Sequence, residues 1–414
     1  MTAFFLWDDA AARLFAPFAL TRPVGELRAG AQLIRERWER LFGVAAGGFV
    51  SAEHLEHFEE PGAPPSAVMV PSGAIIVNAR CVPALDAAST LPGLRSADVM
   101  KWTCDGRLAA LRAPHDLSAH ALRELESLEE LVAPRSTSSV DPLAAKLPGR
   151  WLAAPWDLIA SLDLQLLEDV TALAGELDRV ARPSHALVMG DHPVVLERGA
   201  VVEPLVLLDA TSGPILIRRG AVVAALTRLV GPCIVGEGSS VLGGRIASAA
   251  IGERCKVHGE VSHAVLVGHS NKAHDGFLGH SYLGRWVNLG AGTITSNLKN
   301  TYGPVSLWTP LGMRETGQQF LGTMFGDHSR TAIGTLLSTG TVLGAGANVF
   351  GTGMPPRAVE PFAWGHGDPS KVYELERFLV VAERVMARRG VTLGERARRQ
   401  FAAAYARRAE SSGR

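Results

Sequence analysis

One stretch of the chain brings together a histidine, a glycine-rich corner and two asparagines. His274 lies within Ser-Asn-Lys-Ala-His-Asp-Gly-Phe-Leu-Gly, and the segment from Asn288 to Asn297 is Asn-Leu-Gly-Ala-Gly-Thr-Ile-Thr-Ser-Asn. Histidine gains and loses a proton near neutral pH, which suits a general base. Backbone N–H groups around Ala291 can stabilise an oxyanion, and asparagine side chains can bind hydroxyl and phosphate groups. The stretch therefore has the groups for acyl transfer to a polar acceptor, with His274 as the base.

Two other interpretations of these histidines stay open. The first is that His274 is an exposed residue at a chain corner with no chemical role. The second is metal binding by side chains spaced by six, five and then six residues, which could place some of them on one edge of a coil: His263, His269, His274 with the neighbouring Asp275, and His280. The sequence shows no closed set of ligands for a metal such as zinc, so any metal ligands remain unknown at this stage.

The elements that carry this stretch show a period of six residues. Between residues 187 and 350, large apolar residues recur directly before glycine, and several are followed by another apolar residue six positions later. This is the period of a hexapeptide β-helix, in which each hexad forms one side of a triangular coil. One aliphatic side chain per hexad points inward, and glycine or asparagine turns the corner where φ is often positive. The pairs with this spacing are Val235/Val241, Ile251/Val257, Leu283/Leu289 and Leu343/Val349.

The periodicity therefore predicts a left-handed parallel β-helix, with a glycine-rich antiparallel sandwich as the alternative. A loop leaves the coil at residues 319–328 or at residues 301–317, the second of which contains Pro304 and Pro310.

The glycine distribution places a domain boundary near residue 186. Of the 44 glycines, 11 lie in residues 1–185 and 33 in residues 186–414. The first part alternates strand-like runs with helical patterns, which favours an α/β layered domain. We expect strands at Phe4–Trp7 and 74–77, and helices at 31–41, at 118–132 with Ser118 as the N-cap, and at 168–182, where Pro183 ends the last helix.

Charge and cysteine content limit the class of protein. The 41 basic and 41 acidic side chains give no net charge, which argues against a dedicated nucleic-acid protein. The cysteines, Cys81, Cys104, Cys233 and Cys255, are too widely spaced for a Cys-x-x-Cys motif and are expected to be buried thiols in a reducing cytosol. No run of 18 uncharged apolar residues and no cleavage site occurs. These features predict a cytoplasmic protein without a membrane segment.

The C-terminal part is helical and basic. From residue 370 onward apolar residues return at helical spacing, and residues 377–408 hold nine arginines against two acids, Glu383 and Glu395. A solvated basic helix face is the simplest interpretation. Contact with RNA or with an anionic neighbouring subunit is the alternative.

The motif around His274 resembles a known family. Residues 260–297 are similar to the acetyltransferase half of the bacterial bifunctional glucosamine-1-phosphate acetyltransferase/uridylyltransferase family, which makes UDP-N-acetylglucosamine. His274 falls on that family's general base in the pattern S-x-x-x-H-x-x-x-L-G, and Asn-x-Gly-Ala-Gly-Thr-Ile-Thr-x-Asn is nearly unchanged. The resemblance implies that Glu260, Asn288 and Asn297 bind the sugar phosphate, and that the Ala291 amide stabilises the oxyanion beside acetyl-CoA.

The chain departs from that family at two positions. Ser262 stands where the family has a phosphate-binding lysine, and Phe277 where it has a tyrosine. Lys272, His263 or Arg245 could supply the missing positive charge. By the same resemblance, Thr335, within Ile-Gly-Thr, occupies the position of a serine that contacts coenzyme A.

The start of the chain resembles a divergent sugar nucleotidyltransferase domain. Residues 8–15 follow the first strand without any glycine, so the usual phosphate-binding loop is missing. If nucleotidyl transfer occurs, Arg22 and Arg28 are the candidates for the phosphates, and Asn78 for the nucleotide or the shell of a Mg²⁺ ion. A domain that has lost this chemistry is the alternative, in which Arg28 pairs with Glu26 or Glu36.

Taken together, these features predict three parts: a divergent nucleotidyltransferase-like α/β (Rossmann-like) domain at 1–185, a β-helix acyltransferase domain at 186–368 and a helical tail at 369–414. The resemblance implies acetyl transfer from acetyl-CoA to glucosamine 1-phosphate, nucleotidyl transfer from UTP or another nucleotide, and a homotrimer. No cysteine or activated serine stands in the motif, so direct transfer without an acyl-enzyme is expected. An acyltransferase with another acceptor, or a non-catalytic scaffold that binds nucleotide sugars, remains possible.

Overall fold

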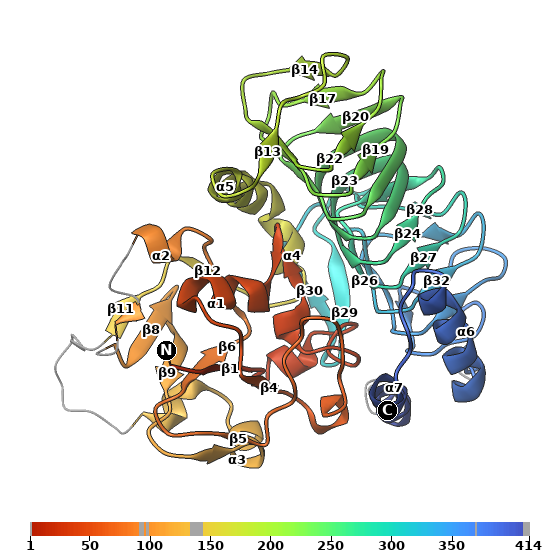
Figure 1. Ribbon diagram of the computed structural model, residues 1–414. Helices are drawn as coiled ribbons and strands as arrows, with labels where there is room; N and C mark the ends of the chain where they lie inside the picture. The colour runs from red at the N-terminus through yellow and green to blue at the C-terminus, as the bar shows by residue number, and fades with distance from the viewer. Residues whose placement is uncertain (1, 91–94, 97–98, 133–143, 369–370, 409–414) are drawn as a thin grey trace.

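The computed structural model describes residues 2–90, 95–96, 99–132, 144–368 and 371–408. Figure 1 shows an α/β domain at the N-terminal end of the chain, a long β-helix beside it and two C-terminal helices. These parts have the order and class that the sequence predicts.

The first domain is built on a six-stranded mixed sheet of order β11-β8-β9-β6-β1-β4. The apolar strand β1 is parallel to β4 and β6, whereas β9 is antiparallel to β6 and β8. Every residue of β1 and β6 is buried, because apolar clusters cover both faces of the sheet. The sheet strands are β1 (Phe4–Trp7), β4 (Gly48–Val50), β6 (Ile75–Asn78), β8 (Lys101–Cys104), β9 (Arg107–Arg112) and β11 (Ala144–Lys146).

Short elements complete this domain, and two predicted helices differ from those observed. The helix predicted at 118–132 is split, because Leu125 is extended between α3 and the 3₁₀ turn Leu128–Leu131; Ser118 caps α3 as expected. The helix predicted at 168–182 ends at Ala174, and a strand follows it. The helices are α1 (Ile34–Phe42), α2 (Ala87–Thr90), α3 (Ala119–Glu124), α4 (Asp157–Ala160) and α5 (Leu162–Ala174), and the small strands are β2 (Arg28–Ala29), β3 (Gln32–Leu33), β5 (Met69–Val70), β7 (Cys81–Pro83), β10 (Leu117–Ser118), β12 (Gly149–Trp151) and β13 (Arg179–Val180).

The second domain is a parallel β-helix with three faces. Each strand pairs in parallel with the strand at the same position of the next coil, as Val195 pairs with Leu216 and Leu208 with Leu229. Face 1 holds β14 (Leu187–Met189), β17 (Leu207–Asp209), β20 (Thr227–Val230), β25 (Phe277–Gly279), β28 (Ile294–Thr295) and β33 (Leu336–Leu337). Face 2 holds β15 (Val194–Glu197), β18 (Ile215–Ile217), β21 (Cys233–Val235), β26 (Tyr282–Arg285), β31 (Thr323–Phe325), β34 (Thr341–Leu343) and β36 (Ala358–Val359). Face 3 holds β16 (Val201–Val202), β19 (Val222–Val223), β24 (Asn271–Lys272), β27 (Asn288–Leu289), β32 (Arg330–Thr331) and β35 (Asn348–Val349), and the long strands β22 (Ser240–Glu253) and β23 (Lys256–Gly268) run round all three faces.

The predicted apolar rungs form the core of the coil. The side chains of the four sequence pairs with six-residue spacing are all at most 1% exposed. Many corner glycines have the predicted positive φ, among them Gly238 (63°) and Gly346 (69°), but others have a different reason. At Gly252 the backbone φ is not positive, but a Cβ atom would lie 2.1 Å from the carbonyl oxygen of Val267 in the next coil. Several corners with positive φ are instead occupied by larger residues, among them His263, His269 and Trp286.

One excursion leaves the coil between β28 and β31. Tyr282 of β26 pairs with Met324 of β31, so this coil is much longer than its neighbours, and the added segment contains the hairpin of β29 (Ser306–Thr309) and β30 (Gly312–Glu315). The prediction of a loop at residues 301–317 is therefore confirmed, whereas residues 319–328 contain a coil strand. The hairpin reaches the first domain, because Val305 and Leu307 belong to that domain's apolar cluster.

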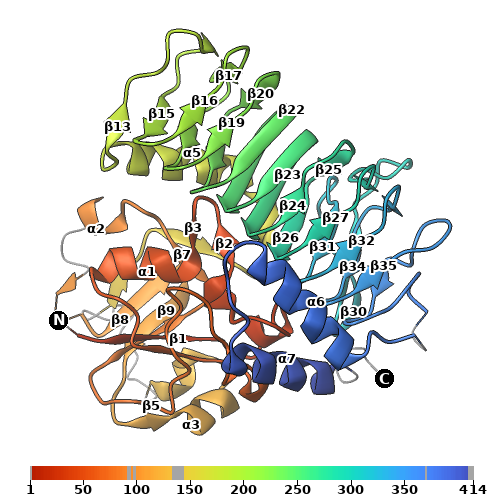
Figure 2. The same ribbon diagram turned by 45° about the vertical axis from the view of Figure 1, so that its right-hand side comes forward.

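The first domain covers face 2 of the β-helix. Outward side chains of this face, such as Leu216, Val265 and Met324, join the cluster that includes the core of the first domain. The helices α6 (Leu375–Ala387) and α7 (Glu395–Arg407) lie along the β-helix and reach the first domain, as Figure 2 shows. Among the described residues, no helix is long and apolar enough to cross a membrane.

Candidate functional site

His274 lies at the edge where face 3 passes into face 1, here called edge 3-1. Its ring is exposed and contacts no hydrogen-bonding group among the described residues. Ala291 stands at the same corner of the next coil, and the two corners are joined by a hydrogen bond from the Gly292 N–H to the Asp275 carbonyl (3.0 Å). No described residue accepts a hydrogen bond from the Ala291 N–H. The structure thus brings together a free imidazole and a free backbone donor in adjacent coils.

Glu260 and Asn297 lie on the outer surface of face 1, Glu260 near edge 3-1 and Asn297 toward the opposite edge, beside His280. Strand pairing aligns Arg245, Glu260 and Phe277 side by side in successive coils, all pointing outward because their neighbour Val261 is buried. The Asn297 side chain donates a hydrogen bond to His280 Nδ1 (2.8 Å). The strand pairing therefore places the positive charge of Arg245 directly beside Glu260.

Asn288 lies on face 3, on the other side of the same edge. Its side-chain oxygen accepts a hydrogen bond from Asn271 (2.9 Å), and strand pairing places Arg330 beside it in the next coil. Thr335 follows the corner of that later coil, and its hydroxyl donates to the Ala332 carbonyl (2.8 Å). Within one chain, His274, Ala291, Glu260, Asn288 and Thr335 therefore lie around edge 3-1, whereas Asn297 lies across face 1 from it.

Lys272 does not lie with the other predicted site residues. Its side chain is 2% exposed and points into the coil, in the row that is otherwise formed by Val257 and Leu289. The ammonium donates to the carbonyl oxygens of two successive corners, His258 (3.0 Å) and His274. Burial lowers the pKa of Lys272 to about 8, although the charge of Asp275 opposes this shift. Lys272 thus supports the backbone of the corner that carries His274.

The histidines considered for metal binding are spread over three edges. A step of five or six residues moves the chain to the next edge, so His263 and His280 share the edge between faces 1 and 2, whereas His269 and His274 lie on the other two. His263 and His280 stack with ring centroids 4.4 Å apart. The described residues contain no group of three or more side chains that could hold a metal ion. The spacing of five or six residues thus places these histidines on different edges, so they do not form one ligand set.

In the first domain, Asp8, Asp9 and Asn78 meet at the carboxyl ends of the parallel strands β1 and β6. Such an edge is where α/β sheets commonly bind ligands. Here the carboxylate of Asp9 accepts hydrogen bonds from the Ala12 N–H (2.7 Å), from Asn78 (2.8 Å) and from Arg80. Burial raises the pKa of Asp8 to about 7. In the loop after β1, a backbone N–H therefore binds a carboxylate of the chain itself, at the place where a phosphate-binding loop would bind a nucleotide.

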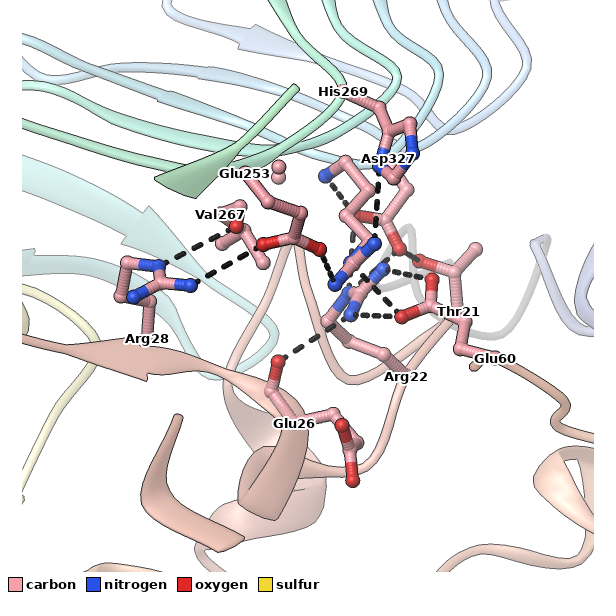
Figure 3. Close-up of polar contacts among 12 residues, drawn as sticks. Thr21, Arg22, Glu26, Arg28, Glu60, Glu253, Val267, His269 and Asp327 are labelled. Atoms are coloured by element: carbon pink, nitrogen blue, oxygen red, sulfur yellow. Dashed lines mark hydrogen bonds and ion pairs between the residues drawn. The ribbon is translucent and has the colours of Figure 1, made fainter. Parts of the chain in front are cut away.

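Arg22 and Arg28 lie in a buried network between the first domain and the β-helix (Figure 3). Arg22 Nε donates to both carboxylate oxygens of Asp327 (2.9 and 3.1 Å), and its terminal nitrogens bind Glu60 (2.8 and 3.2 Å). Arg28 binds Glu253 (3.4 Å). Arg22 is 1% exposed, so a nucleotide phosphate does not reach it.

The network also answers the question of how Arg28 is paired. The predicted partners of Arg28, Glu26 and Glu36, are occupied elsewhere: Glu26 pairs with Arg35 (2.6 Å), and Glu36 accepts the Leu33 N–H (2.8 Å). Because Arg28 reaches across to the β-helix instead, its ion pair joins the two domains.

A cavity of about 560 Å³ that no sequence pattern predicted lies between the first domain and the β-helix. Arg13, from the loop after β1, His54, from the segment after β4, and Arg123 line it on one side, and Trp308 of the excursion lines it on the other. The position of Arg13 in the loop after the first strand was the available signal. The opposite wall comes from the hairpin of β29 and β30, which is so distant in the sequence that no local pattern indicates it.

Comparisons with known proteins match parts of the chain. Residues 4–177 match the family model described as sugar nucleotidyl transferase. A segment of 113 residues is 31% identical to the bifunctional sugar-1-phosphate nucleotidylyltransferase/acetyltransferase of Sulfurisphaera tokodaii, and it covers 27% of this chain and 27% of that protein. The chain thus matches about a quarter of the length of this curated relative. The first domain is similar to sugar nucleotidyltransferases, and the chain joins it to a β-helix.

Proposed function

We propose that the β-helix transfers an acetyl group from acetyl-CoA to the amine of an amino-sugar phosphate, with glucosamine 1-phosphate as the first candidate acceptor. This step would belong to the biosynthesis of UDP-N-acetylglucosamine. The observation that carries the proposal is the pair of free groups at edge 3-1, the exposed His274 imidazole and the Ala291 N–H one coil away.

The chemistry of each group fits this reaction. His274 takes a proton from the acceptor nitrogen as it attacks the thioester carbonyl, and the Ala291 N–H stabilises the negative charge that forms on the thioester oxygen. Glu260 and Asn297 on face 1 and Asn288 on face 3 have the donors and acceptors to hold a sugar phosphate, and Thr335 stands in the next coil for coenzyme A.

Release of free coenzyme A tests the proposal. Wild-type protein with acetyl-CoA and glucosamine 1-phosphate is expected to release coenzyme A, and His274→Ala to lower kcat by about 10²- to 10⁴-fold. The matched control is His192→Ala, an exposed histidine in an early coil of the same β-helix, which should keep full activity. Wild-type turnover in His274→Ala would remove the assigned base. Binding of nucleotide sugars without transfer to any amino sugar would favour the scaffold function instead.

A homotrimer is part of this proposal. The edge that carries His274 also exposes large aliphatic side chains at the corners of other coils: Leu205 is 68%, Leu226 75% and Ile333 80% exposed. A neighbouring copy would cover these side chains and enclose the site between subunits. Light scattering on purified protein is expected to give three times the chain mass of 43.9 kDa, and a monomer at assay concentration would contradict this part.

Nucleotidyl transfer by the first domain is the second candidate, favoured by the cavity that Arg13 and Arg123 line. Asp9 and Asn78 are the residues that could face a Mg²⁺ ion, but the Asp9 carboxylate is already bound by the cationic Arg80. The residues as arranged do not fit the ion, which prefers free carboxylate oxygens. Pyrophosphate release from UTP or dTTP in the presence of a sugar 1-phosphate and Mg²⁺ tests whether the first domain is active. If no nucleotide gives pyrophosphate, the β-helix is the active half.

A further inference from the structure

The proposed acceptor site extends across face 1 from edge 3-1 to the edge between faces 1 and 2, here called edge 1-2. The Glu260 carboxylate lies near edge 3-1, which carries His274, and there it attracts the ammonium of an acceptor and repels its phosphate. Asn297 lies toward edge 1-2 and donates one of its two amide N–H groups to His280 (2.8 Å). Its second N–H can donate to a phosphate oxygen. The phosphate of the acceptor therefore lies away from His274, and any group bonded to that phosphate extends toward edge 1-2.

A cavity of about 510 Å³ lies at edge 1-2, directly beyond Asn297. Its walls come from His263 and His280 at the corner of the coil, from the start of α5 and from residues 318–321, which return from the excursion. The rings of His263, His280 and Phe320 form a stack, with centroids 4.4 and 5.3 Å apart. Phe320, at the end of this stack, is 41% exposed. The cavity thus offers an aromatic face on which a further planar ring can stack.

The polar groups of this cavity suit a neutral part of a ligand. Among the described residues that line it, Asp163 carries the one carboxylate, and there is no lysine or arginine. Burial lowers the pKa of His280 to about 4, so this ring is neutral at pH 7. Such a lining repels a phosphate, whereas a carboxylate can accept ribose hydroxyls and the Gln318 amide can bind the edge of a base. The cavity therefore fits a nucleoside.

We propose that the acceptor of the acetyl group is an amino sugar linked to a nucleoside diphosphate, with its amine at His274, its diphosphate near Asn297 and its nucleoside in the cavity at edge 1-2. This inference rests on the proposed acetyl transfer and names a larger acceptor for it than glucosamine 1-phosphate. The amine nitrogen forms the bond to the acetyl carbon, the C–S bond breaks with its electron pair on sulfur, and the proton that His274 takes from the nitrogen passes to the thiolate. A nucleotidyl transfer to the amino-sugar 1-phosphate must then come before acetylation.

Release of coenzyme A with UDP-glucosamine and with glucosamine 1-phosphate tests the inference. The wild type is expected to use UDP-glucosamine with a kcat/KM about 10- to 100-fold higher, because stacking of a base on an aromatic ring strengthens binding by about this factor. Phe320→Ala should remove most of this preference and leave kcat/KM for glucosamine 1-phosphate unchanged. The matched control is Phe350→Ala, which removes a similarly exposed phenylalanine (37%) outside the cavity and should keep the preference.

The outcomes separate this inference from the proposed function. Equal kcat/KM for the two acceptors, or a preference for glucosamine 1-phosphate, would overturn the inference and leave acetyl transfer standing. A preference for UDP-glucosamine that survives in Phe320→Ala would place the nucleoside elsewhere and would also overturn it. Equal losses with both acceptors in Phe320→Ala would mark a folding defect, and the ratio measured on the wild type then decides. Absence of transfer by the wild type to both acceptors and to other amino sugars would remove both proposals.

Discussion

The ion pair between Arg22 and Asp327 provides a quantitative test of how the two domains are joined. Both side chains are nearly fully buried, and Asp327 also accepts the Thr21 hydroxyl (2.9 Å) and the Arg285 N–H (2.8 Å). Removing one partner leaves the other charge buried without compensation, which costs about 3–5 kcal/mol. Arg22→Met and Asp327→Leu are each expected to lose this amount of stability. The double variant leaves neither of these two charges behind and is expected to lose clearly less than the sum of the two.

Urea unfolding measures this coupling, because urea does not screen charge. Tryptophan fluorescence reports on the junction through Trp286, which lies at the edge beside the network. The free energies of the wild type, both single variants and the double variant form a cycle, and a coupling of several kcal/mol is expected. Losses that add within about 0.5 kcal/mol would show that the two side chains act independently and would refute the reasoning.

Three further predictions concern residues of the β-helix. The pKa of Lys272 falls from 10.5 to about 8 on folding, so between these pH values the unfolded chain binds one more proton than the folded chain. The free energy of unfolding of the wild type should therefore rise by up to roughly 3 kcal/mol relative to that of Lys272→Met as pH rises from 8 to 10.5. The pKa of His269 falls from 6.5 to about 4 on folding, so protonation favours the unfolded chain. The free energy of unfolding of the wild type should therefore fall by up to roughly 3 kcal/mol relative to that of His269→Gln as pH falls from 6.5 to 4. Urea unfolding at several pH values tests both predictions, and wild-type and variant curves of stability against pH that run parallel would contradict them. Gly279→Ala places a Cβ atom 2.4 Å from the Phe277 ring and 2.7 Å from Asn297, so it should raise the acceptor KM with little change in that of acetyl-CoA, and unchanged steady-state constants would contradict this position for the acceptor.

The sequence predicted the architecture well where one period repeats. Pairs such as Val235 and Val241 indicated the coil, and the break in the same period left two segments for the excursion, of which the structure has 301–317. The same period also places Lys272 inside the coil, because it follows the buried Leu266 by six residues and pairs with the buried Val257. The lysine was nevertheless assigned to the substrate site on its residue type alone, since a lysine side chain is rarely fully buried.

The candidate site was predictable only where its residues are close in sequence. His274, Ala291 and Asn288 fall within one motif, and the coil brings them to one edge. Arg22 was assigned to nucleotide phosphates because it follows the first strand, but its partner Asp327 lies 305 residues away. Asp163 and His263, 100 residues apart, meet for the same reason. Contacts of this length depend on how the domains pack, which neither spacing nor residue type determines.

Two of the ion pairs that join the domains limit how this β-helix can evolve. Repeat proteins of this kind gain and lose whole repeats easily, because each repeat contacts only its neighbours. Here Arg28 holds Glu253, and Arg22 holds Asp327 three coils further along the axis. One coil added between these points would move the second contact by about 4.8 Å and separate its partners. The contacts of the first domain therefore fix the number of repeats between these two ion pairs.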